Sequence, residues 1–479
     1  MKIAYLNLPW EEENRWGIRA GCRFPNLQRK NTNSYVPFPF LIAYAASYAE
    51  SEGADVLCID GVAERCSVES VKNRVVDFQP DLIVAEISST SLAKDMGICA
   101  EIRAVCPKAK IALYGPHVDV RPADGLASSA IDFVIRGEPE VTSVELARAI
   151  VDQTELRGIE GLVFRDGDRQ IENPRRTMIR DIDDLPYPKR EGMMMDRYSV
   201  PGFPGPVAFM YGSRGCPYKC NFCLWPQTML AGNFRARNGR KIVEEMAWVL
   251  EKFPQTRSFF FDDDTFNLGR VRCLEFADEM KRRGMKIPWG MNARADNWDR
   301  ELMETLVETG LFTLRIGVES GDPDVLARTK KGITLDQVVS TLEMAHSLGI
   351  KNHISFVIGL IGESDESVNR TIKFIKSLPV ASVQFSVAIP FPGTSYFNDV
   401  EASGHLMTTD WKKFNGFEDI VVRTEKMSPA AIKRALVRAR RSVYFSPKFI
   451  LHRLQYIRNI RDFSAIARKA WQLVVPSTS

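Results

Sequence analysis

The chain has 479 residues, of which 45% are hydrophobic and 26% are charged, and its formal net charge is +4. This length predicts two to four domains, and the composition is typical of a folded protein rather than a disordered one. A charge so close to zero gives no reason to expect a nucleic-acid partner. No apolar run approaches the ~20 residues that span a bilayer, and the amino-terminal residues lack the pattern of a secretory signal.

The chain contains nine cysteines, three of them within the eight residues from Cys216 to Cys223. An odd number and such local crowding fit a metal site in a reducing compartment better than a disulfide framework. We therefore expect a cytoplasmic protein.

Residues 1–152 alternate short apolar runs with longer amphipathic ones. Strands are expected at KIAYLNL, ADVLCID, LIVAEIS, KIALYG and DFVIRG, with helices at residues 40–52, 68–78, 92–105 and 144–152. This alternation predicts an α/β domain with a doubly wound, Rossmann-like parallel sheet. Ligands bind such sheets at the carboxyl ends of the strands, so the candidate contacts are the turns at residues 7–10, 88–91, 115–117 and 137–140.

Three further regions follow this domain. Residues 153–206 are expected to form a linker with a small hairpin, whose turn is the Asp-Gly of GLVFRDGDRQIEN. Residues 207–394 alternate again, with strands expected at VAFMYGS, SFFFDDD, IPWGMNAR, TLRIGVES, NHISFVIGL and SVQFSVAIP. Six βα units predict a partial (β/α)6 barrel, whose chemistry belongs at the strand carboxyl ends.

The last region, residues 395–479, is expected to be helical and basic, with eleven Lys or Arg between Ala431 and Ala470 against the single acid Asp462. A solvated pair of surface helices accounts for such a pattern, and contact with an anionic partner or membrane surface is the alternative. The apolar face of these helices would come from Phe445, Phe449, Ile450, Leu451, Leu454 and Trp471.

The segment GSRGCPYKCNFC follows the first strand expected for the barrel, where a barrel places its active site. Cys216, Cys220 and Cys223 offer three thiolates, whereas a ferredoxin-type cluster and the usual structural zinc site each need four ligands. No fourth Cys or His lies nearby in the sequence, and a distant fourth ligand such as Cys273 leaves a zinc site open as an alternative.

The CxxxCxxC spacing, with the aromatic Phe222 before the last cysteine, resembles the signature of radical S-adenosylmethionine (SAM) enzymes. The resemblance implies a [4Fe-4S] cluster on Cys216, Cys220 and Cys223, with one iron open to the amino and carboxylate groups of SAM. It also implies cleavage of SAM to a 5'-deoxyadenosyl radical, with the electron supplied by an external donor such as flavodoxin or ferredoxin.

Further residues of the expected barrel match the places where this family contacts SAM. Asp262, Asp263 and Asp264 replace the family's common Gly-Gly-Glu and keep a carboxylate for the SAM amino group, although a polar turn or helix cap would also explain them. Arg294 is a candidate partner of the SAM carboxylate, and Glu319 and Ser320 are candidates for the ribose hydroxyls or carboxylate. Each of these three also has a purely structural explanation.

A doubly wound domain before such a barrel resembles the cobalamin-binding class of radical SAM enzymes, and GPHVDVRP and IRGEPE resemble its loop motifs. No DxHxxG motif is present, so no histidine is offered in the usual place as lower cobalt ligand. His117 could contact the corrinoid or serve as a structural hydrogen-bonding residue. The expected cobalamin contacts are Ser88, Ser89, Gly115, His117, Gly137 and Glu138.

This resemblance implies cobalamin-dependent methylation of an unactivated carbon in a small metabolite. The alternative is a cobalamin-free radical dehydratase, cyclase or epimerase acting on an aminosugar or secondary metabolite, because some proteins with this layout keep the domain without the corrinoid. A noncatalytic iron-sulfur or scaffold protein is the third hypothesis.

Overall fold

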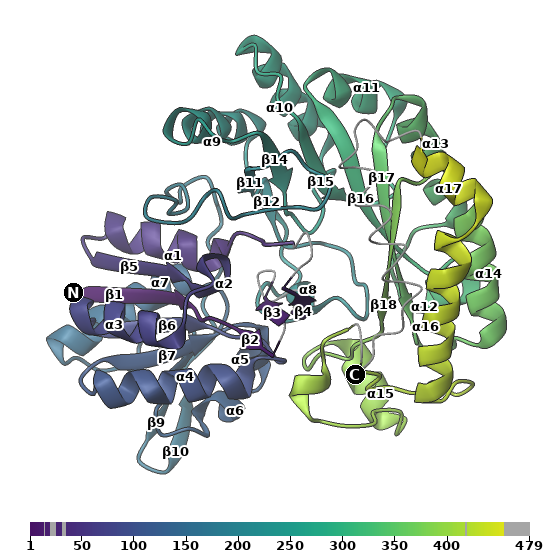
Figure 1. Cartoon of the computed structure of the whole chain (residues 1–479). Coiled ribbons are helices and arrows are strands. Elements are labelled where there is room, and N and C mark those ends of the chain that lie inside the picture. The colour runs from purple at the N-terminus through teal and green to yellow at the C-terminus, as the bar shows by residue number, and fades with distance from the viewer. Residues whose placement is uncertain (14, 20–24, 31–34, 417–418, 455–479) are drawn as a thin grey trace. The chain divides into compact units, whose positions relative to one another are not determined.

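The computed structural model describes residues 1–13, 15–19, 25–30, 35–416 and 419–454 (Figure 1). These residues form two compact units. The first consists of Met1–Asp264, Pro390–Asp399 and Thr409–Asn415, and the second of Thr265–Ile389, Val400–Thr408 and Gly416–Ser479 as far as it is described.

A seven-stranded sheet in the first unit contains the five strands expected in residues 1–152. They are β1 (Lys2–Asn7), β5 (Asp55–Asp60), β6 (Leu82–Glu86), β7 (Lys110–Tyr114) and β8 (Phe133–Ile135), and all of them pair in parallel. The predicted hairpin is β9 (Leu162–Asp166) with β10 (Arg169–Glu172), and it extends this sheet antiparallel to β8. The order is β10-β9-β8-β7-β6-β1-β5.

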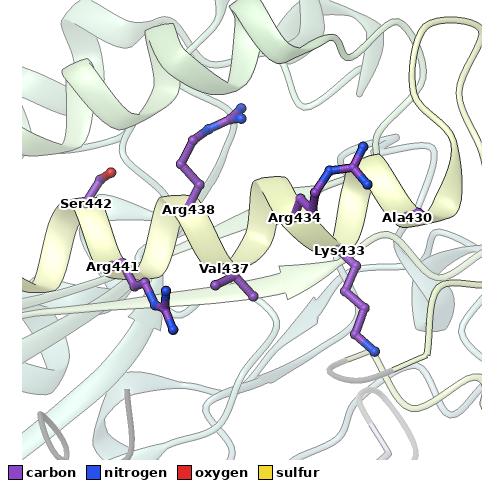
Figure 2. Close-up of a pocket in the computed structure, with 7 residues that line it drawn as sticks. All are labelled: Ala430, Lys433, Arg434, Val437, Arg438, Arg441 and Ser442. Carbon is purple, nitrogen blue, oxygen red and sulfur yellow. The ribbon is translucent and has the colours of Figure 1, made fainter. Parts of the chain in front are cut away.

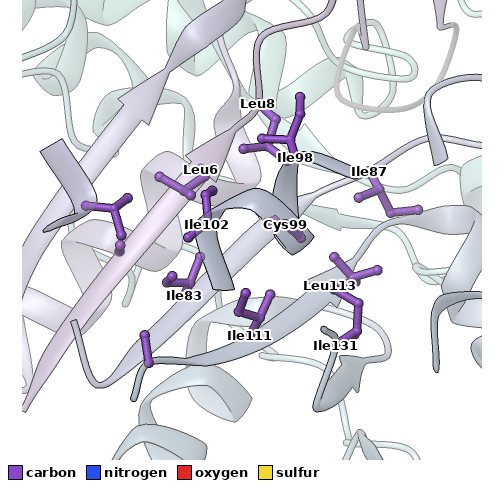
Figure 3. Close-up of a cluster of buried hydrophobic side chains, with 14 of the residues drawn as sticks. Leu6, Leu8, Ile83, Ile87, Ile98, Cys99, Ile102, Ile111, Leu113 and Ile131 are labelled. Atoms are coloured by element: carbon purple, nitrogen blue, oxygen red, sulfur yellow. The ribbon is translucent and has the colours of Figure 1, made fainter. Parts of the chain in front are cut away.

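Helices cover both faces of this sheet, as a doubly wound fold requires. Alternate strand residues such as Leu6, Ile83 and Ile111 pack with α3 (Val68–Phe78) and α4 (Leu92–Val105) in the apolar cluster of Figure 3. Residues between them face the other side, where α1 (Phe40–Ser51) packs against α7 (Pro139–Asp152). The Tyr5 hydroxyl, for example, lies 2.7 Å from the Ser143 hydroxyl of α7.

Short elements at the amino terminus and after the strands were not predicted. They are the small sheet β2 (Glu11–Glu12), β3 (Arg15–Ile18) and β4 (Asn26–Arg29), and the helices α2 (Gly61–Glu64), α5 (Pro116–Val120) and α6 (Pro122–Leu126). The last three begin at strand carboxyl ends, or close after them, and so shape the edge where ligands bind.

The first two strands expected for the barrel lie in the first unit. β11 (Val207–Met210) pairs in parallel with β14 (Ser258–Phe261), and α9 (Gly239–Lys252) connects them. Between β11 and α9 the chain forms a two-stranded ribbon, β12 (Ser213–Arg214) with β13 (Arg235–Ala236), and the short helix α8 (Leu224–Gln227). The cysteine segment is the loop that this ribbon frames.

The second unit carries the other four expected strands, β15 (Trp289–Ala293), β16 (Leu311–Glu319), β17 (Lys351–Ile358) and β18 (Ser382–Val387), which pair in parallel in that order. Its helices include α10 (Arg270–Arg282), α11 (Arg300–Glu308), α12 (Pro323–Arg328), α13 (Leu335–Ser347) and α14 (Asp365–Ser377). All six expected βα strands are therefore present in chain order. The predicted fold class, a doubly wound domain followed by a partial barrel and a helical end, is confirmed.

The carboxyl-terminal region contains α15 (Ser395–Ala402), the 3-10 turn η2 (Trp411–Lys413), α16 (Pro429–Tyr444) and α17 (Pro447–Leu454). Of the expected apolar face, Phe449 is buried, whereas Phe445, Ile450 and Leu451 are exposed. The Leu454 side chain and Trp471 lie outside the described residues. Within the described parts of the chain, no helix has both the length and the apolar character needed to cross a bilayer.

Two glycines provide a test of the strand-end geometry. Gly115 has φ of +137°, and a Cβ there would lie 2.3 Å from the Ile87 carbonyl oxygen. We expect Gly115→Ala to lower the free energy of unfolding by about 1–3 kcal/mol, measured by urea denaturation, because both backbone strain and overlap result. Gly97→Ala is the control, since Gly97 lies exposed within α4 with open space at its Cβ, and alanine there should stabilise by up to about 1 kcal/mol. Equal effects of the two substitutions would contradict this account.

Candidate active site

The cysteine loop leaves β12 and is held against neighbouring backbone. Gly215 has φ of +81°, and a Cβ there would lie 1.8 Å from the carbonyl oxygen of Asn233, so only glycine fits. Cys216 and Cys220 are buried and Cys223 is partly exposed, and none of the three forms a disulfide.

Gln227, at the end of α8, shapes the loop from the other side. Its Nε2 lies 3.1 Å from the carbonyl oxygen of Cys220, 2.9 Å from that of Asn221 and 2.8 Å from that of Cys223. Its Oε1 accepts a hydrogen bond of 2.8 Å from the backbone N–H of Ser395. The loop conformation is thus fixed in part by the contacts between Gln227 and the loop backbone.

The donor chemistry of the loop fits an iron-sulfur cluster. Three thiols are soft ligands, and cluster irons are held at separate corners by single cysteines. In the parts of the chain that the structure describes, no three His, Cys, Asp or Glu side chains surround a point where one metal ion could sit.

The aspartates after β14 lie beside the start of the cysteine loop. Asp263 accepts hydrogen bonds from the backbone N–H of Gly212 at 3.0 Å and from the Ser213 hydroxyl at 2.5 Å. Asp262 accepts a bond of 3.2 Å from the Tyr35 hydroxyl, and Asp264 is partly buried. Asp263 thus joins the carboxyl ends of β11 and β14, and the three carboxylates and the cysteines belong to the same unit.

In the second unit, the structure brings Arg294 and Glu319 together through Lys331. Arg294 forms a two-point ion pair with Asp296, at 2.8 and 2.9 Å, and donates to the carbonyl oxygen of Lys331 at 2.8 Å. The Lys331 ammonium lies 2.7 Å from Glu319 Oε1. Lys331 was missed because the run Lys330, Lys331 is typical of an exposed turn, and only the fold brings it to the end of β16.

Glu319 and Ser320 follow an irregular strand end. Glu319 has φ of +73°, which is rare for a residue other than glycine, and the register of β16 shifts between Gly317 and Glu319. Such strain is concentrated at functional sites. The Ser320 hydroxyl is fully buried and accepts a bond of 3.1 Å from the backbone N–H of Asp322. Contact of Arg294, Glu319 and Ser320 with SAM stays a prediction.

The serines and His117 at the ends of β6 and β7 form a buried polar edge. The Ser88 hydroxyl lies 2.8 Å from that of Ser91, and Ser89 lies 3.0 Å from Nδ1 of His117. Nε2 of His117 lies 3.0 Å from Asp124, and the bond from His117 together with Arg121 lowers the pKa of Asp124 to about 2. Both ring nitrogens of His117 therefore have protein partners.

A second buried polar chain runs along the ends of β1 and β5. Arg19 forms an ion pair of 2.5 Å with Asp95 and donates to Asn7 at 2.7 Å, and Asn7 donates to Asp60 at 2.8 Å. Burial raises the pKa of Asp95 to about 6, against the pull of Arg19, and raises that of Asp60 to about 7. The turn after Asn7 and the arginine-rich run RWGIRAGCRFP, which contains Arg19, stand out in the sequence. The pairing of Arg19 with Asp95 could not be predicted, because the two residues are 76 positions apart.

The IRGEPE loop meets the ribbon around the cysteines. Glu138 and Glu140 form ion pairs of 2.8 and 2.7 Å with Arg214, and Glu138 also lies 2.8 Å from Arg235. Burial opposes the charge on Glu138, yet the two arginines hold its pKa below the usual value, whereas burial raises the pKa of Glu140 even beside Arg214. Gly137, with φ of +80°, donates to Asp119 at 2.8 Å. A cobalamin contact of Gly137 or Glu138 stays a prediction.

One buried acid in the second unit was also missed. Glu363 follows β17 in the turn GLIGE and is completely buried, and its Oε2 accepts the backbone N–H of Gly359. Oε1 is buried without a hydrogen-bond partner. Burial raises the pKa of Glu363 to about 8, although hydrogen bonds from Gly359 and Leu360 act in the opposite direction.

A surface hollow lies along α16 rather than at these strand ends. It has a volume of about 650 Å³ and is lined by Ala430, Lys433, Arg434, Val437, Arg438, Arg441 and Ser442 (Figure 2). Since every lining residue belongs to one helix, the hollow is an open, basic surface groove. It has none of the convergent groups of a cofactor site.

Comparison with known proteins identifies the class. Residues 210–375 match the Radical SAM superfamily, and residues 32–147 match the B12 binding domain. An uncharacterised methyltransferase of Pyrococcus horikoshii is 31% identical over 415 residues, which cover 86% of this chain and 89% of that protein. The chain therefore belongs to the radical SAM superfamily, in its B12-binding methyltransferase class.

More distant similarities include a protein named as a cyclase and a solved methyltransferase structure. An anaerobic magnesium-protoporphyrin IX monomethyl ester cyclase of Rubrivivax gelatinosus is 25% identical, over 79% of this chain and 68% of that protein. The structure of the radical SAM methyltransferase TsrM from Kitasatospora setae, with cobalamin and a [4Fe-4S] cluster bound, has a TM-score of 0.69 at 17% identity. The match covers 100% of this chain and 92% of that one. The fold of both predicted domains is thus found in one known enzyme.

The raised pKa of Glu363 predicts a pH-dependent stability. Between its usual pKa, near 4.5, and about 8, the folded state binds more protons than the unfolded state, so stability falls as the pH rises through this window. Glutamine cannot titrate, so Glu363→Gln should reduce the loss of unfolding free energy between pH 5 and 8.5 by about 2 kcal/mol or more, as measured by urea denaturation. Glu366→Gln, at the exposed start of α14, is the control and should keep the wild-type slope. A wild-type slope in both variants would contradict the assignment.

Proposed function

We propose that this chain is a cobalamin-dependent radical SAM enzyme that methylates an unactivated carbon of a small metabolite. The observation that carries the proposal is the three-cysteine loop, which shares one compact unit with the B12-binding domain and is joined to it by buried ion pairs. The similarity to a methyltransferase over most of both chains supports methylation over the cobalamin-free alternatives.

Cys216, Cys220 and Cys223 would hold the [4Fe-4S] cluster. When bound, the cluster supplies the electron that cleaves SAM to a 5'-deoxyadenosyl radical, and cobalamin serves as the methyl carrier. Phe222, partly exposed between Asn221 and Cys223, would border the SAM site. Asp263 orients the start of the loop through Gly212 and Ser213. Asp262 and Asp264 would offer carboxylates to the SAM amino group.

In the second unit, Arg294, Glu319 and Ser320 would contact the SAM carboxylate and ribose. Arg294 presents a guanidinium at the end of β15, and Glu319 and Ser320 lie at the end of β16. Asp296 pairs with Arg294, and Lys331 pairs with Glu319. Such contacts keep binding side chains in the orientation that a ligand requires.

The corrinoid would lie against the carboxyl edge of the seven-stranded sheet, where Ser88, Ser89 and Gly115 are found. His117 is held on both sides by Ser89 and Asp124, which supports a structural role for it rather than cobalt ligation. The absence of DxHxxG from the sequence agrees with this assignment.

The cysteine loop provides the direct test. Cys216→Ala, Cys220→Ala and Cys223→Ala should each lose reconstituted iron and all formation of 5'-deoxyadenosine, because a three-point ligand set has no spare member. Cells that carry these variants should accumulate a metabolite one methyl group lighter than the product of the wild-type strain, as measured by mass spectrometry. Cys273→Ala, in α10, is the control and should keep both the reconstituted iron and the formation of 5'-deoxyadenosine. Iron and 5'-deoxyadenosine retained in the loop variants would refute the proposal. A metabolite change other than one methyl would favour the dehydratase, cyclase or epimerase alternative.

An external protein donor, flavodoxin or ferredoxin, would supply the electron, and the enzyme would work in the cytoplasm. Both proposals follow from the requirement for a reduced cluster, which a reducing compartment sustains. The basic face of α16 requires no partner in its simplest interpretation, that of a solvated helix surface.

The alternative of membrane contact is testable in the same carboxyl-terminal region. Exposed Phe445, Ile450 and Leu451 lie beyond the basic groove of α16, a combination found in helices that bind anionic bilayers. If the alternative holds, the protein should sediment with vesicles containing phosphatidylserine and not with neutral vesicles, and Leu451→Glu should abolish this binding. We expect no sedimentation with either vesicle if the face is simply solvated.

A further inference from the structure

The two arginines that frame the cysteine loop share one buried glutamate. Glu138 bonds Arg214 at 2.8 Å and takes two bonds of 2.8 Å from Arg235. Arg214 and Arg235 are opposite each other in the β12–β13 ribbon. Glu140 adds a second carboxylate 2.7 Å from Arg214. Both strands of the ribbon, β12 and β13, therefore bind the start of α7 through these ion pairs.

This ion-pair cluster is placed to act on the cysteines. Arg214 is 3% exposed and lies two residues before Cys216, with its guanidinium 4.5 Å from the ring centre of Tyr44. Such a buried charge is held in one position, because any movement would separate it from the carboxylates that offset its loss of water. The sequence segment between Arg214 and Cys216 is the single residue Gly215, whose fit against Asn233 leaves it little freedom.

Stability alone is a weak explanation of such an arrangement. Buried ion pairs are often no more stabilising than apolar side chains of similar size, and their best-supported benefit is a defined geometry. The partners here belong to two separate sequence motifs, IRGEPE in the B12-binding domain and GSRGC in the cysteine loop. Transfer of a methyl group between SAM at the cluster and the corrinoid would need a defined geometry between these two motifs.

We propose that Arg214 is a positioning residue, which Glu138 and Glu140 hold in place so that the cysteine loop keeps a fixed distance from the B12-binding domain. Its buried charge also acts on the reduction potential of the cluster. The proposal rests on the proposed function, since it requires a cluster on the three cysteines. It assigns Glu138 to the cysteine loop rather than to the corrinoid ring.

The positive charge of Arg214 predicts the direction in which each substitution shifts the midpoint potential of the cluster. A nearby cation stabilises the reduced, more negative cluster and so raises its midpoint potential. Arg214→Met should lower the midpoint potential, and Glu138→Gln should raise it, because it leaves the arginines less neutralised. Arg214→Lys keeps the charge but not the two-carboxylate geometry, so we expect a near-normal potential with an altered electron paramagnetic resonance (EPR) spectrum of the reduced cluster.

The experiment compares these variants of the full chain, reconstituted with iron and sulfide, by redox titration and EPR spectroscopy. Glu145→Gln is the control, because Glu145 lies in the same helix, pairs with Arg176 and is more exposed. It should match the wild type in both measurements. Circular dichroism checks that each variant is folded. If Arg214→Met does not fold, Arg214→Lys still tests the proposal.

Opposite shifts of potential in Arg214→Met and Glu138→Gln, or the altered spectrum of Arg214→Lys, support the proposal. Folded variants with wild-type potentials and spectra would overturn it while leaving the proposed function intact. A wild-type chain that holds no cluster would overturn both.

Discussion

The site depends on buried charged side chains, each of which must stay paired with a side chain of opposite charge. Arg214, Glu138 and Glu140 are almost completely withdrawn from water, and their ion pairs with one another and with Arg235 offset the loss of hydration. The same rule holds the buried pair Arg19 and Asp95 at the edge of the seven-stranded sheet. These pairs fix loops that apolar packing alone would leave free, because loops have little apolar surface to bury.

The fold could be predicted from the sequence where a local pattern of residues determines the structure. Continuous apolar runs such as KIAYLNL and LIVAEIS are typical of strands buried on both faces, and they form β1 and β6. The Asp-Gly turn located the hairpin β9 and β10, although its pairing with β8 could not be predicted from local pattern. The cysteine motif was visible for the same reason, since its spacing is local and its chemistry is specific.

The rest of the site could not be predicted, because it consists of contacts between distant residues. Glu138 and Arg214 are 76 positions apart, and nothing in either motif indicates the other. Lys331 looked like a surface residue, and only the fold places it beside Glu319. Glu363 lies in a glycine-containing turn whose complete burial depends on the packing of the second unit. The two-residue strands β12 and β13 are too short to leave a periodic pattern.

The proposed enzyme combines a site that makes a radical with a domain that carries a methyl group, and methylation depends on that domain. The most direct measurement is the corrinoid content of wild-type protein reconstituted with iron, sulfide and hydroxocobalamin and freed of unbound cofactor, determined by its visible absorption. We expect one corrinoid and one [4Fe-4S] cluster per chain. A chain that retains the cluster but no corrinoid would contradict it.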